Sequence, residues 1–99
     1  MLDIKKTLNG TNLEIALSGR LDTITAPELD AVVKESLDGV ESLVFDFTDL
    51  AYVSSAGLRV LLSAQKIMNG QGSMVVRNVS EEIQEIFDVT GFTDILTIE

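Results

Sequence analysis

The spacing of apolar residues changes character along the chain. Apolar and polar residues alternate over residues 2–8 and again over 12–18, which is typical of strands with one buried face. Asn9-Gly10, between the two runs, is a strong turn signal. The sequence therefore predicts two opening strands, at about 2–8 and 12–18, joined by a hairpin-like turn, with a loop over Ser18–Asp22.

From residue 24 onward, patterns typical of helices alternate with patterns typical of strands. This exchange favours parallel strands linked by right-handed crossovers, so we expect one α/β domain over residues 1–99, with helices packed on a mixed sheet in the order ββαβαβαβ. The apolar run at 43–47 predicts a central strand covered on both faces. The predicted helices cover about 26–38, 58–69 and 81–90, and the remaining strands lie at 74–76 and 95–98.

Several helix ends carry recognisable signals. Thr25 and Glu28 have the spacing of a capping box, and Gly39 stands where a helix C-cap is expected. Ser80 is a suitable N-cap for the third helix, and Gly91 is placed to end it. These signals set the boundaries of the predicted helices.

Composition excludes several classes of function. The 99 residues include no histidine and no cysteine, which excludes histidine-based triads, disulfides and thiolate metal sites. A net charge of -9 opposes binding to nucleic acid and to anionic lipid. The chain has no signal-peptide core, no apolar run near the ~20 residues that span a bilayer, and no glycine-rich nucleotide loop. We expect a cytoplasmic protein that binds neither nucleic acid nor membrane and uses no cofactor.

Two hydroxyls stand where the second helix is expected to begin, in Ser54-Ser55-Ala56-Gly57. Helix capping explains them most simply, because serine is a preferred N-cap. A nucleophilic serine is disfavoured, because Val53 replaces the first glycine of a Gly-x-Ser-x-Gly elbow and no histidine can activate the hydroxyl. A third interpretation is a serine phosphorylated by another protein, since a phosphate at a helix N-terminus faces free N–H groups.

Three carboxylates are candidates for the surroundings of this helix end. Asp22 lies in the loop after the second strand, where a local cap is the usual role of an aspartate, and Asp46 and Asp49 lie in or after the central strand. A cluster of the three would suit Mg²⁺. Spacing alone does not place them together, and no metal-binding motif accompanies them.

The residues around these serines resemble a known family. Val-Phe-Asp-Phe-Thr-Asp-Leu at 44–50, followed by Tyr-Val-Ser-Ser-Ala-Gly-Leu-Arg at 52–59, resembles the signature of STAS domains and, more narrowly, of bacterial anti-sigma factor antagonists. The resemblance extends to Gly-Arg-Leu-Asp at 19–22 and to Ile-Phe-x-x-x-Gly-Phe at 86–92, and so spans nearly the whole chain. It implies the STAS fold, a four- to five-stranded mixed sheet flanked by helices.

The resemblance also implies a function without catalysis. In that family the unphosphorylated protein binds an anti-sigma factor that is also a serine kinase, which releases the sigma factor. Phosphorylation breaks the complex, and a PP2C-type phosphatase restores it. The phosphoacceptor of the family falls on Ser55 and its loop aspartate on Asp22. The partner-binding surface would then consist of Asp22, Ser54, Ala56, Gly57 and Leu58.

Some alternatives stay open from the sequence. Many relatives carry aspartate where this chain has Ser54, so Ser54 is an alternative phosphoacceptor to Ser55. Arg59 is either a solvated residue on the helix surface or pairs with a carboxylate of the binding partner. The whole domain would alternatively serve as a constitutive adaptor in a lipid-transport or stressosome-like assembly.

Overall fold

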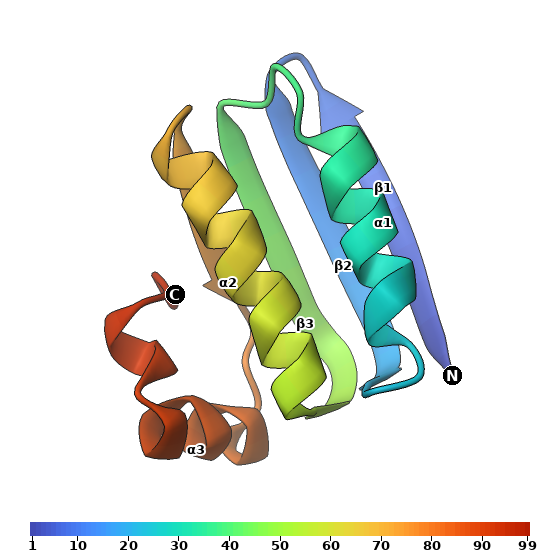
Figure 1. Ribbon diagram of the computed structural model, residues 1–99, viewed down its shortest axis with the longest axis vertical. Helices are drawn as coiled ribbons and strands as arrows, with labels where there is room; N and C mark the ends of the chain where they lie inside the picture. The colour runs from blue at the N-terminus through green and yellow to red at the C-terminus, as the bar shows by residue number, and fades with distance from the viewer.

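The computed structural model describes residues 1–99 as a four-stranded sheet with two helices on one face and a third helix across one end (Figure 1). Strand order is β1-β2-β3-β4, with β1 antiparallel to β2 and the other neighbours parallel. The predicted mixed α/β sheet is therefore confirmed. Its elements are β1 (Leu2–Asn9), β2 (Asn12–Leu21), α1 (Ala26–Ser36), β3 (Ser42–Val53), α2 (Ser55–Asn69), β4 (Ser73–Arg77) and α3 (Glu81–Thr90).

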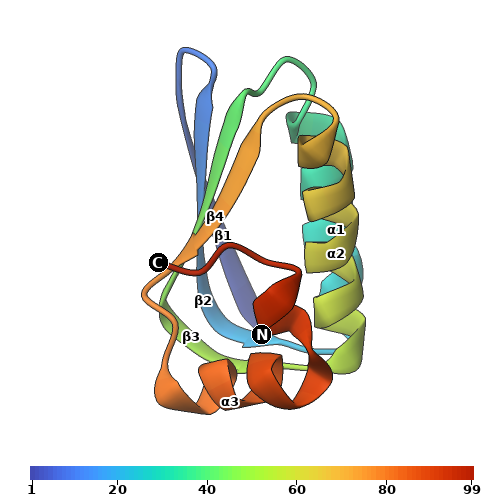
Figure 2. The same cartoon turned by 90° about the vertical axis from the view of Figure 1, so that its left-hand side faces the viewer.

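The sheet has one covered face and one open face. α1 and α2 lie together on the covered face, and no helix lies flat on the opposite face (Figure 2). Along β3, Phe45 and Phe47 are fully buried, whereas Val44 and Asp46 are only partly buried. The prediction of a strand covered on both faces is therefore wrong. Val44 made the run look continuous, but it lies on the open face opposite Val75 of β4.

Phenylalanine side chains connect the third helix to the core. Phe47 of β3 lies between Phe45 and Phe87 of α3, with ring centroids 6.2 Å and 6.4 Å away. All three rings are fully buried. Burying such a side chain contributes about 1.5–3 kcal/mol, so this contact anchors α3 across the end of the sheet.

The helix ends follow their sequence signals in two cases and depart from them in two. Ser80 caps α3 as predicted, and Gly91 ends it with a φ of 81° in the left-handed region. The capping box predicted at Thr25 and Glu28 does not form, because the Thr25 side chain hydrogen-bonds into the preceding loop. Gly39 is not the C-cap of α1, because the helix ends at Ser36 and Gly39 lies in the turn that follows.

None of the helices is both long and apolar enough to cross a membrane.

The segment predicted as a loop after residue 18 is an irregular part of β2. The pairing of β2 with β3 shifts between Ala16 and Ser18 and again between Gly19 and Arg20. Gly19 has a φ of 100°, and a side chain there would overlap the carbonyl oxygen of Met1. The glycine thus lets the strand bend while it stays in the sheet.

The C-terminal residues form less structure than predicted. After α3 the chain makes a short 3₁₀ helix, Phe92–Asp94. The final strand is reduced to one bridge between Val76 and Ile98, with Val76 exchanging two backbone hydrogen bonds of 2.9 Å with Thr97 and Glu99. A three-residue stretch with a single bridging pair is too short to count as a fifth strand.

Candidate functional site

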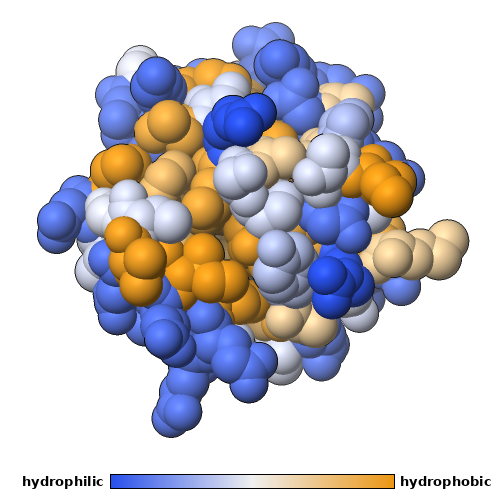
Figure 3. Space-filling model, turned by 60° about the horizontal axis from the view of Figure 1, so that its bottom comes forward, coloured by the Kyte–Doolittle hydropathy of each residue, from blue (hydrophilic) through white to orange (hydrophobic).

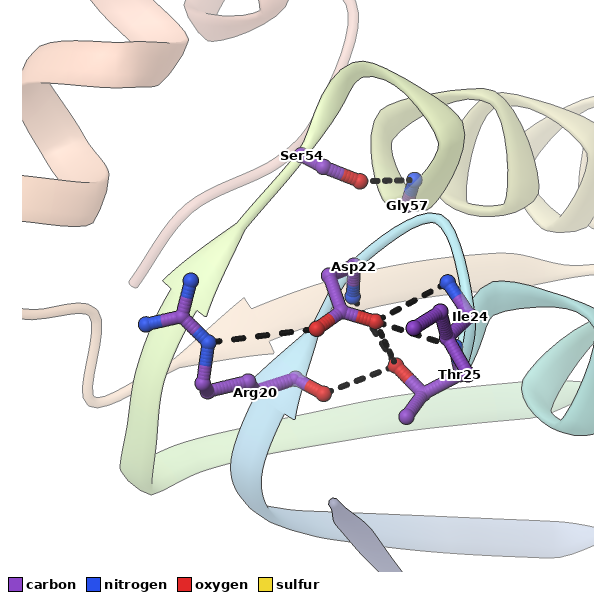
Figure 4. Close-up of polar contacts among 6 residues, drawn as sticks. All are labelled: Arg20, Asp22, Ile24, Thr25, Ser54 and Gly57. Atoms are coloured by element: carbon purple, nitrogen blue, oxygen red, sulfur yellow. Dashed lines mark hydrogen bonds and ion pairs between the residues drawn. The ribbon is translucent and has the colours of Figure 1, made fainter.

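The ends of β2 and β3 bring two sequence-distant segments together. Leu21 lies opposite Val53 at the end of the parallel pair, and the Ser54 N–H donates to the Leu21 carbonyl oxygen at 2.8 Å. Loops that follow the carboxyl ends of parallel strands share one edge of the sheet. Asp22 and the Ser54–Ala56 segment are therefore neighbours at this end of the molecule (Figure 4).

The carboxylate of Asp22 organises the loop between β2 and α1. Its Oδ1 accepts hydrogen bonds from the N–H groups of Ile24 and Thr25, both at 3.0 Å (Figure 4). These bonds lower the pKa of Asp22, and the Thr25 N–H is the largest cause. The carboxylate is thus ionised at neutral pH and held in place, which agrees with a local capping role.

A buried hydroxyl and an exposed guanidinium complete this loop. Thr25 is 4% exposed, and its Oγ1 accepts the Asp22 N–H at 2.9 Å and lies 2.8 Å from the Arg20 carbonyl oxygen. The Arg20 guanidinium lies 3.8 Å from Asp22 Oδ2 and 4.5 Å from the centroid of the Tyr52 ring. Sequence reasoning missed this group, because Arg20 and Tyr52 become neighbours only through the register of β2 with β3.

The two adjacent serines have different environments. Ser54 is the N-cap of α2, and its Oγ accepts the Gly57 N–H at 3.3 Å. Ser55 is the first residue of the helix, and its exposed hydroxyl makes no hydrogen bond within the chain. Capping therefore accounts for Ser54 and leaves Ser55 unexplained.

Two residues of the expected partner surface face inward. Gly57 is buried, and a Cβ added to it would lie 2.6 Å from Cγ of Leu21. Leu58 is only 5% exposed. This corrects the expectation that both lie on the surface, since they form the packing beneath it. Ala56 remains partly exposed.

An open groove of about 410 Å³ runs between α1 and α2. The two helices run in the same direction (Figure 1). The groove lining includes Thr23 and Ala56, so the groove begins at the end of the molecule where both helices start. Its wall on α2 includes Ala56, Arg59 and Ser63, and its wall on α1 includes Pro27 and Asp30. The groove gives a partner docked at this end a concave extension to fill.

Apolar side chains are exposed around the same end. Ile24, in the β2–α1 loop, is 85% exposed, and Tyr52, just before Ser54, is 37% exposed. Figure 3 shows apolar area on this face of the molecule with hydrophilic side chains around it. The sequence analysis did not identify these two residues as exposed contact residues, although an isoleucine between the threonines of a short polar loop is a signal of this kind.

The other two carboxylates, Asp46 and Asp49, lie along β3 before its end, opposite Ala16 and Ser18 of β2, and form no cluster with Asp22. Asp46 lies in mid-strand, opposite Ala16 and Arg77, and is separated from Val53 by roughly 20 Å of extended chain. Asn78 and Thr48 hydrogen-bond to it and lower its pKa, with Asn78 the larger cause. No group of three acidic side chains in the structure is placed to hold a metal ion.

Together the fold and the site define a class of protein. It is a single-domain α/β module with a mixed sheet and an exposed serine, free of hydrogen bonds, at the start of a helix. The chain belongs to the STAS domain family. The family profile described as STAS domain matches residues 3–99, which is nearly all of the sequence.

Individual relatives carry a common name. The anti-sigma-B factor antagonist of Bacillus subtilis is 30% identical over 98 residues, covering 98% of this chain and 88% of that protein. An anti-sigma factor antagonist from Mycobacterium paratuberculosis has a TM-score of 0.89 at 18% identity, covering 99% of this chain and 85% of that one. The relatives are named as regulators and not as enzymes, in agreement with the predicted non-catalytic role.

One structural relative is known in two states. The Bacillus anti-sigma factor antagonist SpoIIAA has unphosphorylated and phosphorylated structures, each with a TM-score of 0.77 and 17% identity to this chain. They cover 100% and 98% of this chain and 87% and 91% of their own. At this identity the likeness establishes the shared fold.

Proposed function

We propose that this protein is an anti-sigma factor antagonist and that phosphorylation of Ser55 switches its partner binding off. The observation that carries the proposal is the contrast between the two serines: the Ser54 hydroxyl caps α2, whereas that of Ser55 is exposed and unbonded. The names of the sequence relatives support the class, and the phosphorylated form of SpoIIAA supports the modification.

The partner would be an anti-sigma factor that is also a serine kinase. It would dock in the cytoplasm on the exposed parts of Asp22, Ser54 and Ala56, with apolar contacts to Ile24 and Tyr52. Gly57 and Leu58 support this surface from beneath. A PP2C-type phosphatase would reverse the modification.

The switch follows from charge and from the start of the helix. A phosphate adds about -1.5 to -2 charges at a point that a bound partner must cover. The N–H groups of Ser55 and Ala56 begin α2 without an acceptor inside the helix, so the phosphate has local donors and the domain stays folded. Binding is lost through desolvation and repulsion at the contact, with no change of fold.

Binding measurements test this proposal. The anti-sigma factor kinase of the same organism is titrated with wild type, Ser55→Ala, Ser55→Asp and the control Ser73→Asp, which places the same charge at the opposite end of the sheet. We expect Ser55→Ala to bind as wild type does without being phosphorylated, and Ser55→Asp to bind at least tenfold more weakly. Wild-type affinity of Ser55→Asp would contradict the switch and favour a constitutive adaptor.

Peptide mass spectrometry of the phosphorylated protein identifies the acceptor. The structure favours Ser55, because phosphorylation of Ser54 would replace the hydroxyl that caps α2. Phosphate found only on Ser54 would overturn the assignment of Ser55.

A further inference from the structure

The basic side chains of this acidic protein are mostly paired. Four of the seven lie within 4.0 Å of a carboxylate, namely Lys6, Arg20, Lys34 and Arg77. Arg59 on α2 is exposed and has neither an ion pair nor a side-chain hydrogen bond within the chain. Its guanidinium is therefore free to bind an anion that is added to a neighbouring side chain.

Arg59 stands one helical turn after Ser55. Residues four apart on a helix share a face, with Cβ atoms about 5–6 Å apart. Helical side chains lean toward the N-terminus, so the Arg59 side chain is directed back toward the first turn. Arg59 also lines the rim of the groove beside Ala56, with no neighbour holding it elsewhere.

We propose that the Arg59 guanidinium binds the phosphate on Ser55 within the same chain by donating hydrogen bonds to it, and this inference rests on the proposed phosphorylation of Ser55. The planar guanidinium presents paired N–H donors that match phosphate oxygens, and the arginine stem is long enough to span one turn. In the phosphorylated protein the pair holds the phosphate against α2. In the unmodified protein the Arg59 guanidinium is exposed and unpaired.

The other charges near this helix end oppose the phosphate or are already engaged. Asp22 lies in the adjacent loop with the Arg20 guanidinium 3.8 Å from its carboxylate, and Asp30 and Lys34 lie on α1 across the groove. Lys34 is paired with Asp30 at 3.1 Å. The carboxylates raise the second pKa of a nearby phosphate, whereas Arg59 lowers it, so replacing Arg59 isolates its contribution on a constant background.

The test measures the phosphate directly. Phosphoserine is incorporated at position 55 during translation, and its second pKa is determined by ³¹P NMR titration in otherwise wild-type protein, in Arg59→Gln and in Lys66→Gln. Lys66 is exposed and unpaired on the same helix but three turns from Ser55, so it controls for the loss of one charge. We expect Arg59→Gln to raise the phosphate pKa by about 0.2–0.7 unit and Lys66→Gln by under about 0.1 unit.

The outcomes separate this inference from the proposed function. Equal phosphate pKa values in wild type and Arg59→Gln, with both proteins folded by circular dichroism, would overturn the pairing. Because the phosphate is installed without a kinase, the titration does not depend on which serine the cell modifies. If the phosphorylated protein still binds the anti-sigma factor, the proposed switch is contradicted. The pairing of Arg59 with the phosphate is tested by the NMR titration alone.

Discussion

α1 and α2 begin at the same end of the molecule, yet their first turns are built differently. At the start of α1, Asp22 and Thr25 bind each other and the surrounding backbone, which leaves little polar capacity unused. At the start of α2 one hydroxyl, that of Ser54, acts as the cap, and Ser55 next to it is free. The polar groups at the start of α1 are thus satisfied by one another and stabilise the local structure. The start of α2 leaves the Ser55 hydroxyl exposed and without a hydrogen bond inside the chain.

Leu21 connects the two starts. Its carbonyl oxygen accepts the Ser54 N–H, and its fully buried side chain fills the space beside Gly57. The position of Ser55 thus depends on a residue from the other segment. Substitutions around Leu21 measure how strongly the two starts depend on each other.

The largest expected effect is from Leu21→Ala. Removing a fully buried leucine side chain leaves a cavity between the starts of both helices, and we expect a loss of about 2–5 kcal/mol in the free energy of unfolding. Urea denaturation measures it, with Ile24→Ala as the control, since that side chain is exposed and should change stability by less than about 0.5 kcal/mol. A loss under about 1 kcal/mol for Leu21→Ala would mean that the two starts are independent.

Gly57→Ala tests the same contact from the other side. Alanine favours a helix over glycine by about 1 kcal/mol, but its Cβ would overlap Leu21. We expect a net loss of about 1–3 kcal/mol from overpacking. In the Leu21→Ala background the side-chain overlap is gone and only the carbonyl oxygen of residue 21 stays close, at 3.1 Å, so the same substitution should cost clearly less than in wild type. Additive effects in this double-mutant cycle would contradict the proposed contact.

Alanine substitutions at the two serines should differ. Ser54→Ala removes the cap of α2 and should cost about 1 kcal/mol, whereas Ser55→Ala should change stability by less than about 0.5 kcal/mol. Thermal unfolding of the two single variants provides the comparison. Equal losses at both positions would show that Ser55 also supports the helix, against the division of roles drawn from the hydrogen bonds.

The smallest effect concerns pH and the start of α1. Because the pKa of Asp22 is lowered on folding, its contribution to stability is present above the ordinary pKa of about 3.9 and is lost as pH falls through the folded value. The stability advantage of wild type over Asp22→Asn should therefore shrink below about pH 4. The lowered pKa values of Asp46 and Asp88 are common to both proteins and cancel in the difference. A difference independent of pH would rule out an ionised role for Asp22.

The sequence by itself determined the features that depend on neighbours along the chain. Periodicity placed the strands and helices, and Ser80 and Gly91 marked the ends of α3 because capping and the left-handed turn involve residues only a few positions apart. The serine motif, through its resemblance to the STAS family, indicated which helix start to examine. Local signals failed where a side chain had a distant alternative, as Thr25 shows.

Only the tertiary structure decided how the site is divided among its residues. The parallel register of β2 with β3 sets Leu21 against Gly57 and Arg20 against Tyr52, and it thereby turns Gly57 and Leu58 inward. These contacts join residues more than 30 positions apart, and their energies depend on a packing arrangement that no local pattern encodes. The same arrangement decides which serine has the free hydroxyl. The end of β3 is fixed by the hydrogen bond from the Ser54 N–H to the Leu21 carbonyl oxygen, so Ser54 becomes the N-cap and Ser55 the first residue of α2.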